Sequence, residues 1–189
     1  MTTGAIQPLP LENAVIFDTE TTGVKLIDEI IELGIINAVS GEIILQTLVK
    51  PSIPIPAEAT AVHGITNEMV ANAPTWLDIQ VDVIKALYGK RAIAYNSDFD
   101  RRMILQTASK YKAPADLMEF YRSLEYPCAM KWYAEFYNEW NTYKNSYKWQ
   151  KLTDAAFQQD VQIDDLDAHR ASCDCEITRR VINAVNAQL

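Results

Sequence analysis

The sequence predicts an α/β fold in which helices flank a mixed β-sheet. Three apolar runs of strand length lie before residue 50, and helical periodicity then alternates with one further short strand. Neighbouring strands followed by alternating helices and strands are typical of a layered α/β domain with a mixed sheet. The chain has 189 residues, without a repeat or a dividing linker, so we expect one domain over residues 1–189.

The predicted sheet begins with a three-stranded meander. Residues 14–19 form an apolar run that ends in threonines, and residues 1–13 before it are expected to form an N-terminal arm. Residues 30–39 and 42–49 are β-rich runs separated by a Ser-Gly turn signal. These three runs are therefore predicted to be consecutive antiparallel strands.

The remainder of the chain is predicted to be mostly helical. Three prolines after residue 50 favour a loop that extends to residue 66. Later apolar residues recur at helical spacing, and Ser97 is expected to begin a helix. The expected elements are helices over residues 76–87, 97–108, 129–140, 152–158 and 168–188, and a short strand over 91–95.

Composition excludes several classes of protein. No run of about 18 apolar residues is present, which argues against a membrane span, and residues 1–13 lack the pattern of a signal peptide. Three cysteines without a C-x-x-C pair favour reduced thiols in a cytoplasmic protein. The formal net charge of −8 predicts a weak, salt-sensitive hold on long duplex DNA and fits an enzyme that binds a short single-stranded end.

Asp18 and Glu20 close the first predicted strand, in the run FDTETTG. Residues two apart on a strand project from one face, and neighbouring carboxylates repel unless a cation or a proton lies between them. An isolated pair of this kind is more often a solvated strand end or a helix cap. Here Thr21, Thr22 and Gly23 follow, and their backbone amides can reach a nucleotide.

Two further carboxylates come from later segments. Asp100 follows Ser97 by three residues, a spacing that also fits a capping box at the start of a helix. Asp174 lies five residues after His169 on the last predicted helix, and an imidazole can accept a proton from an attacking water near neutral pH. Carboxylate oxygens suit Mg²⁺ or Mn²⁺. A pair of such ions is a common device for cutting a phosphodiester.

Taken together, these segments resemble the DEDD family of 3′→5′ exonucleases, which contains the proofreading subunit of bacterial DNA polymerase III. The resemblance covers about residues 14–182 and rests on FDTETTG at 17–23, N-x-x-F-D at 96–100 and H-x-A-x-x-D at 169–174. The histidine of the third motif is that of the DEDDh subgroup. The run HGIT at 63–66 is also widespread in these enzymes, whereas Tyr95 stands where many members have a histidine.

The resemblance implies an RNase H-like fold and two Mg²⁺ ions, for which Mn²⁺ can substitute. Asp18 would bridge the ions, and His169 would be the general base. The implied catalytic residues are Asp18, Glu20, Asp100, His169 and Asp174, and the four carboxylates among them are the implied metal ligands. The expected substrate contacts are Thr21, Thr22, Gly23, His63, Ile65, Asn96 and Phe99. For Ile65 and Phe99, ordinary core packing is an equal alternative.

Residues 120–149 carry most of the aromatic side chains, interleaved with lysines. Such interleaving suits single-stranded nucleic acid. Trp132, Phe136 and Trp140 recur every four residues, however, so a buried helical stripe or an oligomer contact is the favoured interpretation. Lysines between 148 and 151, just before the third motif, are the favoured phosphate contacts.

The favoured function is a metal-dependent 3′→5′ exonuclease that hydrolyses single-stranded DNA ends to nucleoside 5′-monophosphates, in proofreading or repair. One alternative is a ribonuclease of the same family that trims RNA or degrades short oligoribonucleotides. Another is a non-enzymatic module that binds a polymerase, against which the intact motifs count. The expected partners are single-stranded 3′ ends, of DNA rather than RNA, and a DNA polymerase. No contact with a membrane is expected.

Overall fold

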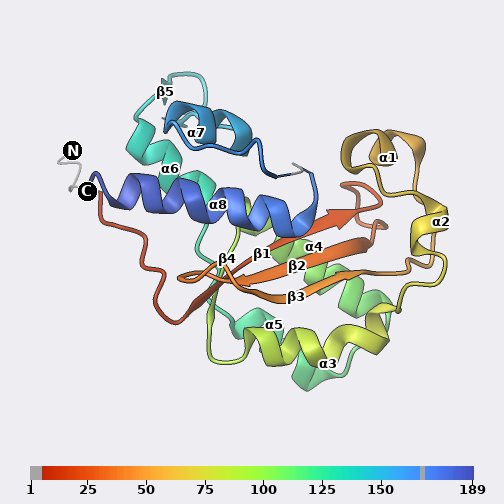
Figure 1. The fold of residues 1–189 in the computed structure, drawn as a ribbon. Helices are drawn as coiled ribbons and strands as arrows, with labels where there is room; N and C mark the ends of the chain where they lie inside the picture. The colour runs from red at the N-terminus through yellow and green to blue at the C-terminus, as the bar shows by residue number, and fades with distance from the viewer. Residues whose placement is uncertain (1–5, 167–168) are drawn as a thin grey trace.

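The computed structural model describes residues 6–166 and 169–189. Its main sheet has four strands in the order β3-β2-β1-β4. An antiparallel meander comprises β1 (Ala14–Thr21), β2 (Ile30–Asn37) and β3 (Ile43–Leu48), and β4 (Arg91–Ile93) pairs parallel with β1. The predicted α/β fold with a mixed sheet is confirmed (Figure 1).

Helices cover both faces of this sheet (Figure 1). One face carries α6 (Ala129–Tyr137), α7 (Leu152–Gln158) and α8 (Ala171–Asn186), and the other carries α3 (Trp76–Leu87), α4 (Ser97–Lys110) and α5 (Ala115–Ser123). Beside the end of β1 lie α1 (Ala57–His63) and α2 (Asn67–Val70), and next to α6 lies a hairpin of β5 (Trp140–Asn141) and β6 (Ser146–Tyr147).

Alternation along β1 decides which side chains face which helices. Val15 and Phe17 pack in the core formed with α3, α4 and α5, whereas Ile16 packs in the core formed with α6, α7 and α8. Because successive strand residues point to opposite faces, Asp18 and Glu20 continue the face of Ile16. The sequence therefore places this acidic pair opposite the first turn of α8.

Two predicted helix boundaries are corrected by the structure. The last helix begins at Ala171 rather than at residue 168, which lies outside the described residues, as do residues 1–5 of the expected arm. The helix predicted over residues 129–140 ends at Tyr137, because Asn138 takes the left-handed conformation, with φ 60°, as its C-cap. Trp140 consequently belongs to β5, and the helical stripe predicted to include it is wrong at that residue.

Three short helices were not predicted. The loop expected up to residue 66 contains α1, and α2 follows it after Gly64, which has φ 71°. Thr66 caps α2 by accepting a hydrogen bond from the Met69 backbone. The third is α5, whose Tyr121 is fully buried in the core beneath the sheet. Helices this short depend on tertiary packing, which sequence periodicity does not reveal.

The described part of the N-terminal arm is docked on α8. The Leu9 backbone N–H donates to Asn186 Oδ1 at 2.8 Å, and Asn186 Nδ2 donates back to the Leu9 carbonyl at 2.9 Å. Leu11 is buried in the core of that face. No helix within the described ranges combines the length and the apolar character that a transmembrane span needs.

Candidate active site

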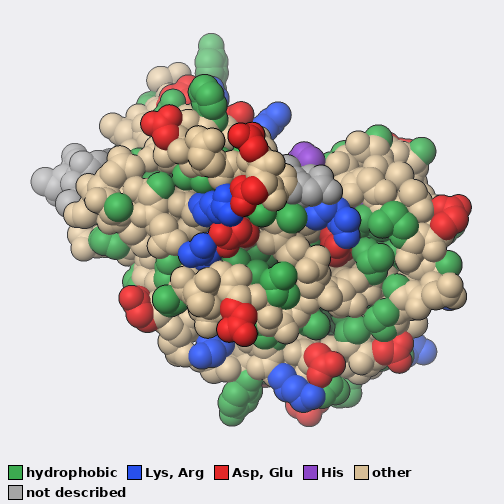
Figure 2. Space-filling model, viewed as in Figure 1, with side chains coloured by type: hydrophobic (Ala, Val, Ile, Leu, Met, Phe, Trp, Pro, Cys, Tyr) green, Lys and Arg blue, Asp and Glu red, His purple; other side chains and the backbone are tan. Residues whose placement is uncertain are grey.

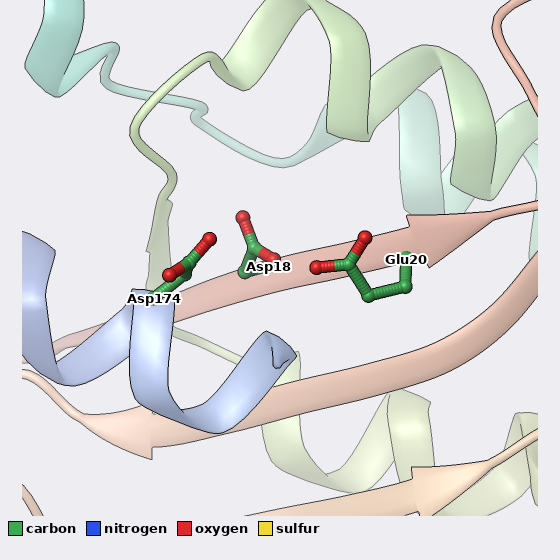
Figure 3. Close-up of side chains that lie close together, drawn as sticks. All are labelled: Asp18, Glu20 and Asp174. Carbon is green, nitrogen blue, oxygen red and sulfur yellow. The ribbon is translucent and has the colours of Figure 1, made fainter. Parts of the chain in front are cut away.

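Residues from the two ends of the chain meet at the α8 face of β1. Carboxylate oxygens of Asp18, Glu20 and Asp174 all lie within 4.8 Å of one another. In Figure 3, Asp18 lies between Glu20 and Asp174, with Asp18 and Glu20 on β1 and Asp174 on α8. Hard oxygen donors gathered in this way fit a divalent cation such as Mg²⁺ or Mn²⁺.

Asp100 joins this group from α4. It is buried in the first turn of that helix and accepts a hydrogen bond from Thr19 Oγ1 at 2.7 Å. The capping-box interpretation is not supported, because Asn96 is the N-cap residue and no side chain caps the helix. A pocket of about 190 Å³ is lined by Asp18, Glu20, Asp100, His169 and Asp174, together with Asn96, Phe99 and Leu152. All five predicted catalytic residues therefore line one pocket.

The electrostatics of the pocket favour a bound cation. Burial and the neighbouring carboxylates raise the pKa of Glu20 to about 8 and the pKa of Asp18 well above its usual range. Burial also raises the pKa of Asp100 to about 7, although the hydrogen bond from Thr19 opposes this, and it raises the pKa of Asp174. Arg170 lowers the pKa of Glu20 only in part. Ionising all four groups together thus requires positive charge from outside the cluster.

His169 lies at the rim of the pocket rather than on α8. Its side chain is exposed, and its backbone has φ 67° in the turn before the helix. The His169 backbone N–H donates to Asp174 Oδ1 at 3.2 Å, so the two residues are held together. An exposed imidazole beside half-buried carboxylates can exchange protons with solvent.

Tyr95, which stands where many members of the DEDD family have a histidine, also lines this pocket. Its hydroxyl donates to the Gln150 carbonyl at 2.9 Å. The side chain therefore ties β4 to the segment before α7.

A second pocket, of about 430 Å³, adjoins the carboxylates along the chain after β1. Five of the predicted substrate contacts line it: Thr21, Thr22, Gly23, His63 and Phe99. The apolar part of its wall is formed by Val24, Pro56, Ala59 and Val62. Phe99 and Glu20 line both pockets, whereas Asn96 lines only the smaller one. The volume is in the range of small-ligand sites.

The loop after β1 is organised by Asp28, which the sequence analysis missed. Thr22 Oγ1 donates to Asp28 Oδ1 at 3.0 Å, and the Lys25 backbone N–H donates to Oδ2 at 2.6 Å. A Cβ atom on Gly23 would lie 2.6 Å from the same carboxylate. The Thr21 hydroxyl donates to the Gly23 carbonyl at 2.7 Å. Both threonine hydroxyls are thus used within the loop, which leaves backbone atoms to face a ligand.

His63 and Ile65 have different surroundings. His63 Nδ1 accepts the Ile65 backbone N–H at 3.0 Å, and burial lowers the pKa of His63. The neutral ring therefore carries its proton on Nε2, which is buried beside the Thr21 backbone without a hydrogen bond of good geometry to a described residue. Ile65 is fully buried in a core cluster with Ile31 and Val70. Its side chain thus takes the core-packing alternative that the sequence left open beside substrate contact.

Comparison with known proteins agrees with this geometry. A protein-family model described as Exonuclease matches residues 15–182. The chain belongs to the exonuclease family. It is 44% identical over 174 residues to an uncharacterized exonuclease, CP81, of Escherichia phage 186, which covers 92% of this chain and 88% of that protein. It is 39% identical over 92 residues to exodeoxyribonuclease 10 of Escherichia coli strain K12, or 47% of this chain and 39% of that one.

Solved structures agree as well. Exonuclease X in complex with 5′-overhanging duplex DNA superposes with a TM-score of 0.66 at 28% identity, covering 92% of each chain. A 3′-exonuclease that recognises a histone mRNA stem-loop has a TM-score of 0.70 at 17% identity, over 98% of this chain and 67% of that one, and shows the shared fold. The RNase H-like exonuclease fold expected from the resemblance is confirmed, and the protein is a nuclease.

The aromatic segment of this exonuclease divides into a buried and an exposed part. Tyr133 is fully buried on α6, and Trp132 and Phe136 pack against the same core, as the stripe predicted. The hairpin that follows is exposed: Trp140 has 51% and Tyr143 100% of its surface accessible. Of the lysines favoured as phosphate contacts, Lys148 pairs with Glu139 at 2.9 Å.

The surface over α8 does not form a basic patch. In Figure 2, Lys and Arg side chains on this face lie beside Asp and Glu side chains. Arg180 pairs with Asp165 at 2.7 Å and with Glu176 at 2.9 Å, and Arg179 pairs with Glu176 at 2.6 Å. These arginines are thus paired with acids of the same chain.

Proposed function

We propose that this exonuclease removes nucleotides from the 3′ ends of single-stranded DNA, one nucleoside 5′-monophosphate at a time, with Mg²⁺ bound by Asp18, Glu20, Asp100 and Asp174. The observation that carries the proposal is the acidic cluster of three carboxylates within 4.8 Å, beside a nucleotide-sized pocket. The relative named exodeoxyribonuclease 10 and the DNA complex of exonuclease X support DNA as the substrate.

The acidic residues would be the ligands of the cation. Asp18 lies between Glu20 and Asp174, which suits it to share ions with both, and Asp100 faces the same pocket from α4. Bound Mg²⁺ would neutralise the scissile phosphate and activate the attacking water. The raised pKa values of the four carboxyl groups support this assignment, since they mark the charge that the chain leaves uncompensated.

The proton of the attacking water would pass to His169. Its ring is exposed at the rim of the carboxylate pocket, and the Asp174 carboxylate holds its backbone. From this position the imidazole can accept the proton and release it to solvent. General-base catalysis of this kind typically contributes about 10²–10⁴-fold to a rate.

The terminal nucleoside would occupy the larger pocket. Its apolar wall suits a base, and Phe99, which lines both pockets, suits a contact next to the scissile bond. His63 lines the same pocket and would pack against the sugar or the base. Asn96 would contact the phosphate side.

The upstream strand would leave across the segment before α7. Leu152 lines the carboxylate pocket, and the exposed Trp149 and Lys151 precede it directly. An aromatic ring and a lysine at such a rim suit a base and a phosphate of single-stranded DNA. Trp149→Ala is expected to raise KM for a 20-nucleotide oligomer about tenfold. Tyr88→Ala, which removes an aromatic ring 73% exposed at the end of α3, is the matched control and should leave KM unchanged.

One assay tests the function. Oligonucleotides labelled at the 5′ end, as single-stranded DNA, recessed duplex and RNA, are incubated with Mg²⁺, Mn²⁺ or EDTA. We expect shortening from the 3′ end, fastest on single-stranded DNA and absent in EDTA or with Asp18→Asn. Cleavage that persists in EDTA, or that begins inside the strand, contradicts the proposal. If RNA is degraded faster than DNA, RNA rather than DNA is the preferred substrate.

A polymerase partner and a cytoplasmic location stay predictions. The relative named DNA polymerase III subunit epsilon of Treponema pallidum is 37% identical over 87 residues, which is 44% of this chain and 40% of that protein.

A further inference from the structure

The first turn of α8 lies directly on the backbone of β2 at Gly34. A Cβ atom on Gly34 would come within 2.6 Å of the Ser172 backbone nitrogen and 2.7 Å of the Ala171 carbonyl carbon. No side chain larger than hydrogen fits between them. Gly34 therefore sets how closely the helix that carries Asp174 approaches the strand next to β1.

Glu32 lies two residues before Gly34 on the same face of β2 and bonds to the same turn. Its Oε1 accepts a hydrogen bond from Arg170 Nη2 at 2.6 Å, and its Oε2 accepts the Ala171 backbone N–H at 3.0 Å. Arg170 Nε donates to both oxygens, at 3.2 and 3.1 Å. No side-chain bond from Arg170, the N-cap residue, caps α8, so Glu32 supplies from a distant strand the acceptor that a helix N-terminus needs.

Glu32 is placed where stability alone does not require a carboxylate. It is 1% exposed, both its oxygens are occupied, and it stands outside the set of three carboxylates that can share an ion. It pairs across the sheet with Glu20 and raises the pKa of that residue. Replacing a buried ion pair with apolar side chains is often neutral for stability. The Glu32 carboxylate instead fixes Arg170 through a bidentate interaction.

We propose that Glu32 and Gly34 are positioning residues, which dock the first turn of α8 on β2 and thereby hold His169 and Asp174 against Asp18. His169 has φ 67°, a conformation seldom taken by residues other than glycine, and it directly precedes the anchored Arg170. Asp174 Oδ1 accepts a hydrogen bond from the His169 backbone N–H, so the anchored turn fixes the positions of both residues. The proposal rests on the proposed nuclease function, because activity is one of its readouts.

Glu32→Gln tests the proposal because it keeps the size of the side chain and removes its charge. Glu29→Gln is the matched control: Glu29 is also buried, next to β2, and its partner is Lys110 rather than α8. For Glu32→Gln we expect kcat to fall about 10- to 100-fold, with KM for single-stranded DNA within about twofold of wild type. The dissociation constant for Mn²⁺, measured by electron paramagnetic resonance, should rise about tenfold. Glu29→Gln should change neither quantity below its melting temperature.

Hydrogen exchange gives a readout that is independent of activity. The amides of Ala171 and Ser172 should exchange faster in Glu32→Gln than in wild type, and at the wild-type rate in Glu29→Gln. Arg170→Lys keeps the charge but loses the bidentate interaction with Glu32, so its kcat should lie between those of wild type and Arg170→Ala.

Several outcomes overturn the proposal. Wild-type kcat and Mn²⁺ affinity in Glu32→Gln would do so, as would an equal loss of kcat in Glu29→Gln, which would mean general loosening of the fold. A wild-type protein that binds Mn²⁺ without degrading DNA contradicts the proposed function, and Mn²⁺ affinity with hydrogen exchange then still decides the positioning role. A wild-type protein that binds no Mn²⁺ overturns both.

Discussion

Two groups of carboxylates, one buried and one mostly half-buried, differ in what neutralises them. Glu29 lies at the start of β2 and accepts hydrogen bonds from Lys110 Nζ, from the Ser52 backbone at 2.9 Å and from the Ser52 hydroxyl at 2.7 Å. Burial alone would raise the pKa of Glu29, but these partners lower it. The chain itself supplies the countercharge, so Glu29 is ionised and structural.

The carboxylates around Asp18 are the opposite case. Burial raises the pKa of Asp18, and the other acids, Asp100 first, raise it further. Arg170, the basic side chain that acts on Glu20, is bound to Glu32 and lowers the pKa of Glu20 only partly. The difference teaches where to expect an external cation: at clustered, partly buried acids that face one another rather than a lysine.

The largest effect should come from removing one acid of each kind. Asp18→Asn is expected to lower kcat by a factor on the order of 10³ or more, because the cation site acts as a unit. Its metal-free melting temperature at pH 8 should rise, since one repelling buried charge is gone. Glu29→Gln should show the reverse: near wild-type kcat, with unfolding easier by about 2 kcal/mol because Lys110 and Ser52 lose a charged acceptor. Equal loss of activity in both variants contradicts the comparison.

His169 separates proton transfer from cation binding, because it is exposed and carries no buried charge. His169→Ala should lower kcat about 10²-fold with little change in melting temperature. The Mg²⁺ concentration for half-maximal rate should stay near that of wild type, unlike that of Asp18→Asn. Retention of more than about a tenth of the wild-type rate would rule out this residue as the general base.

The comparison also predicts how stability depends on pH. Carboxyl groups whose pKa is raised by folding bind protons more tightly in the folded state, so they stabilise it at low pH and lose that effect as pH rises through about 7 to 8. The metal-free protein should therefore melt about 5 °C or more lower at pH 8.5 than at pH 5.5. Mg²⁺ should raise the melting temperature mainly at the higher pH. A metal-free melting temperature that is flat or rises over this range contradicts the assignment.

The sequence predicted the acidic residues of the site better than the residues that hold them in place. Asp18 and Glu20 were predictable because strand alternation puts them on one face, and Asp174 because H-x-A-x-x-D at 169–174 resembles the third motif of the DEDD family. Glu32 was missed because it stands alone in the apolar run IIELGII, and its partner Arg170 is 138 positions later in the chain. Nothing local marks a carboxylate that acts through so distant a residue.

Packing decided the remaining differences. Ile65 was placed at the substrate because it belongs to the HGIT run, but it fills a core beneath α2 that the sequence does not display. Trp140 fitted a four-residue period, yet the left-handed Asn138 ended the helix before it. In both places a tertiary contact or a helix cap, rather than the local pattern, decides where the side chain lies.

Asp28 gives a third kind of buried carboxylate and the smallest expected effect. It forms no salt bridge with a described residue, and its oxygens accept bonds from the Thr22 hydroxyl and the Lys25 backbone. Asp28→Asn should therefore leave kcat and Mg²⁺ activation unchanged, because no cation ligand is lost. Loosening of the pocket wall at residues 22–25 should raise KM for single-stranded DNA by about three- to fivefold, which corresponds to the roughly 1 kcal/mol of a weakened hydrogen bond. A fall in kcat instead would place Asp28 with the cation-binding acids, and the distinction drawn between buried acids that the chain satisfies and those it leaves unsatisfied would fail.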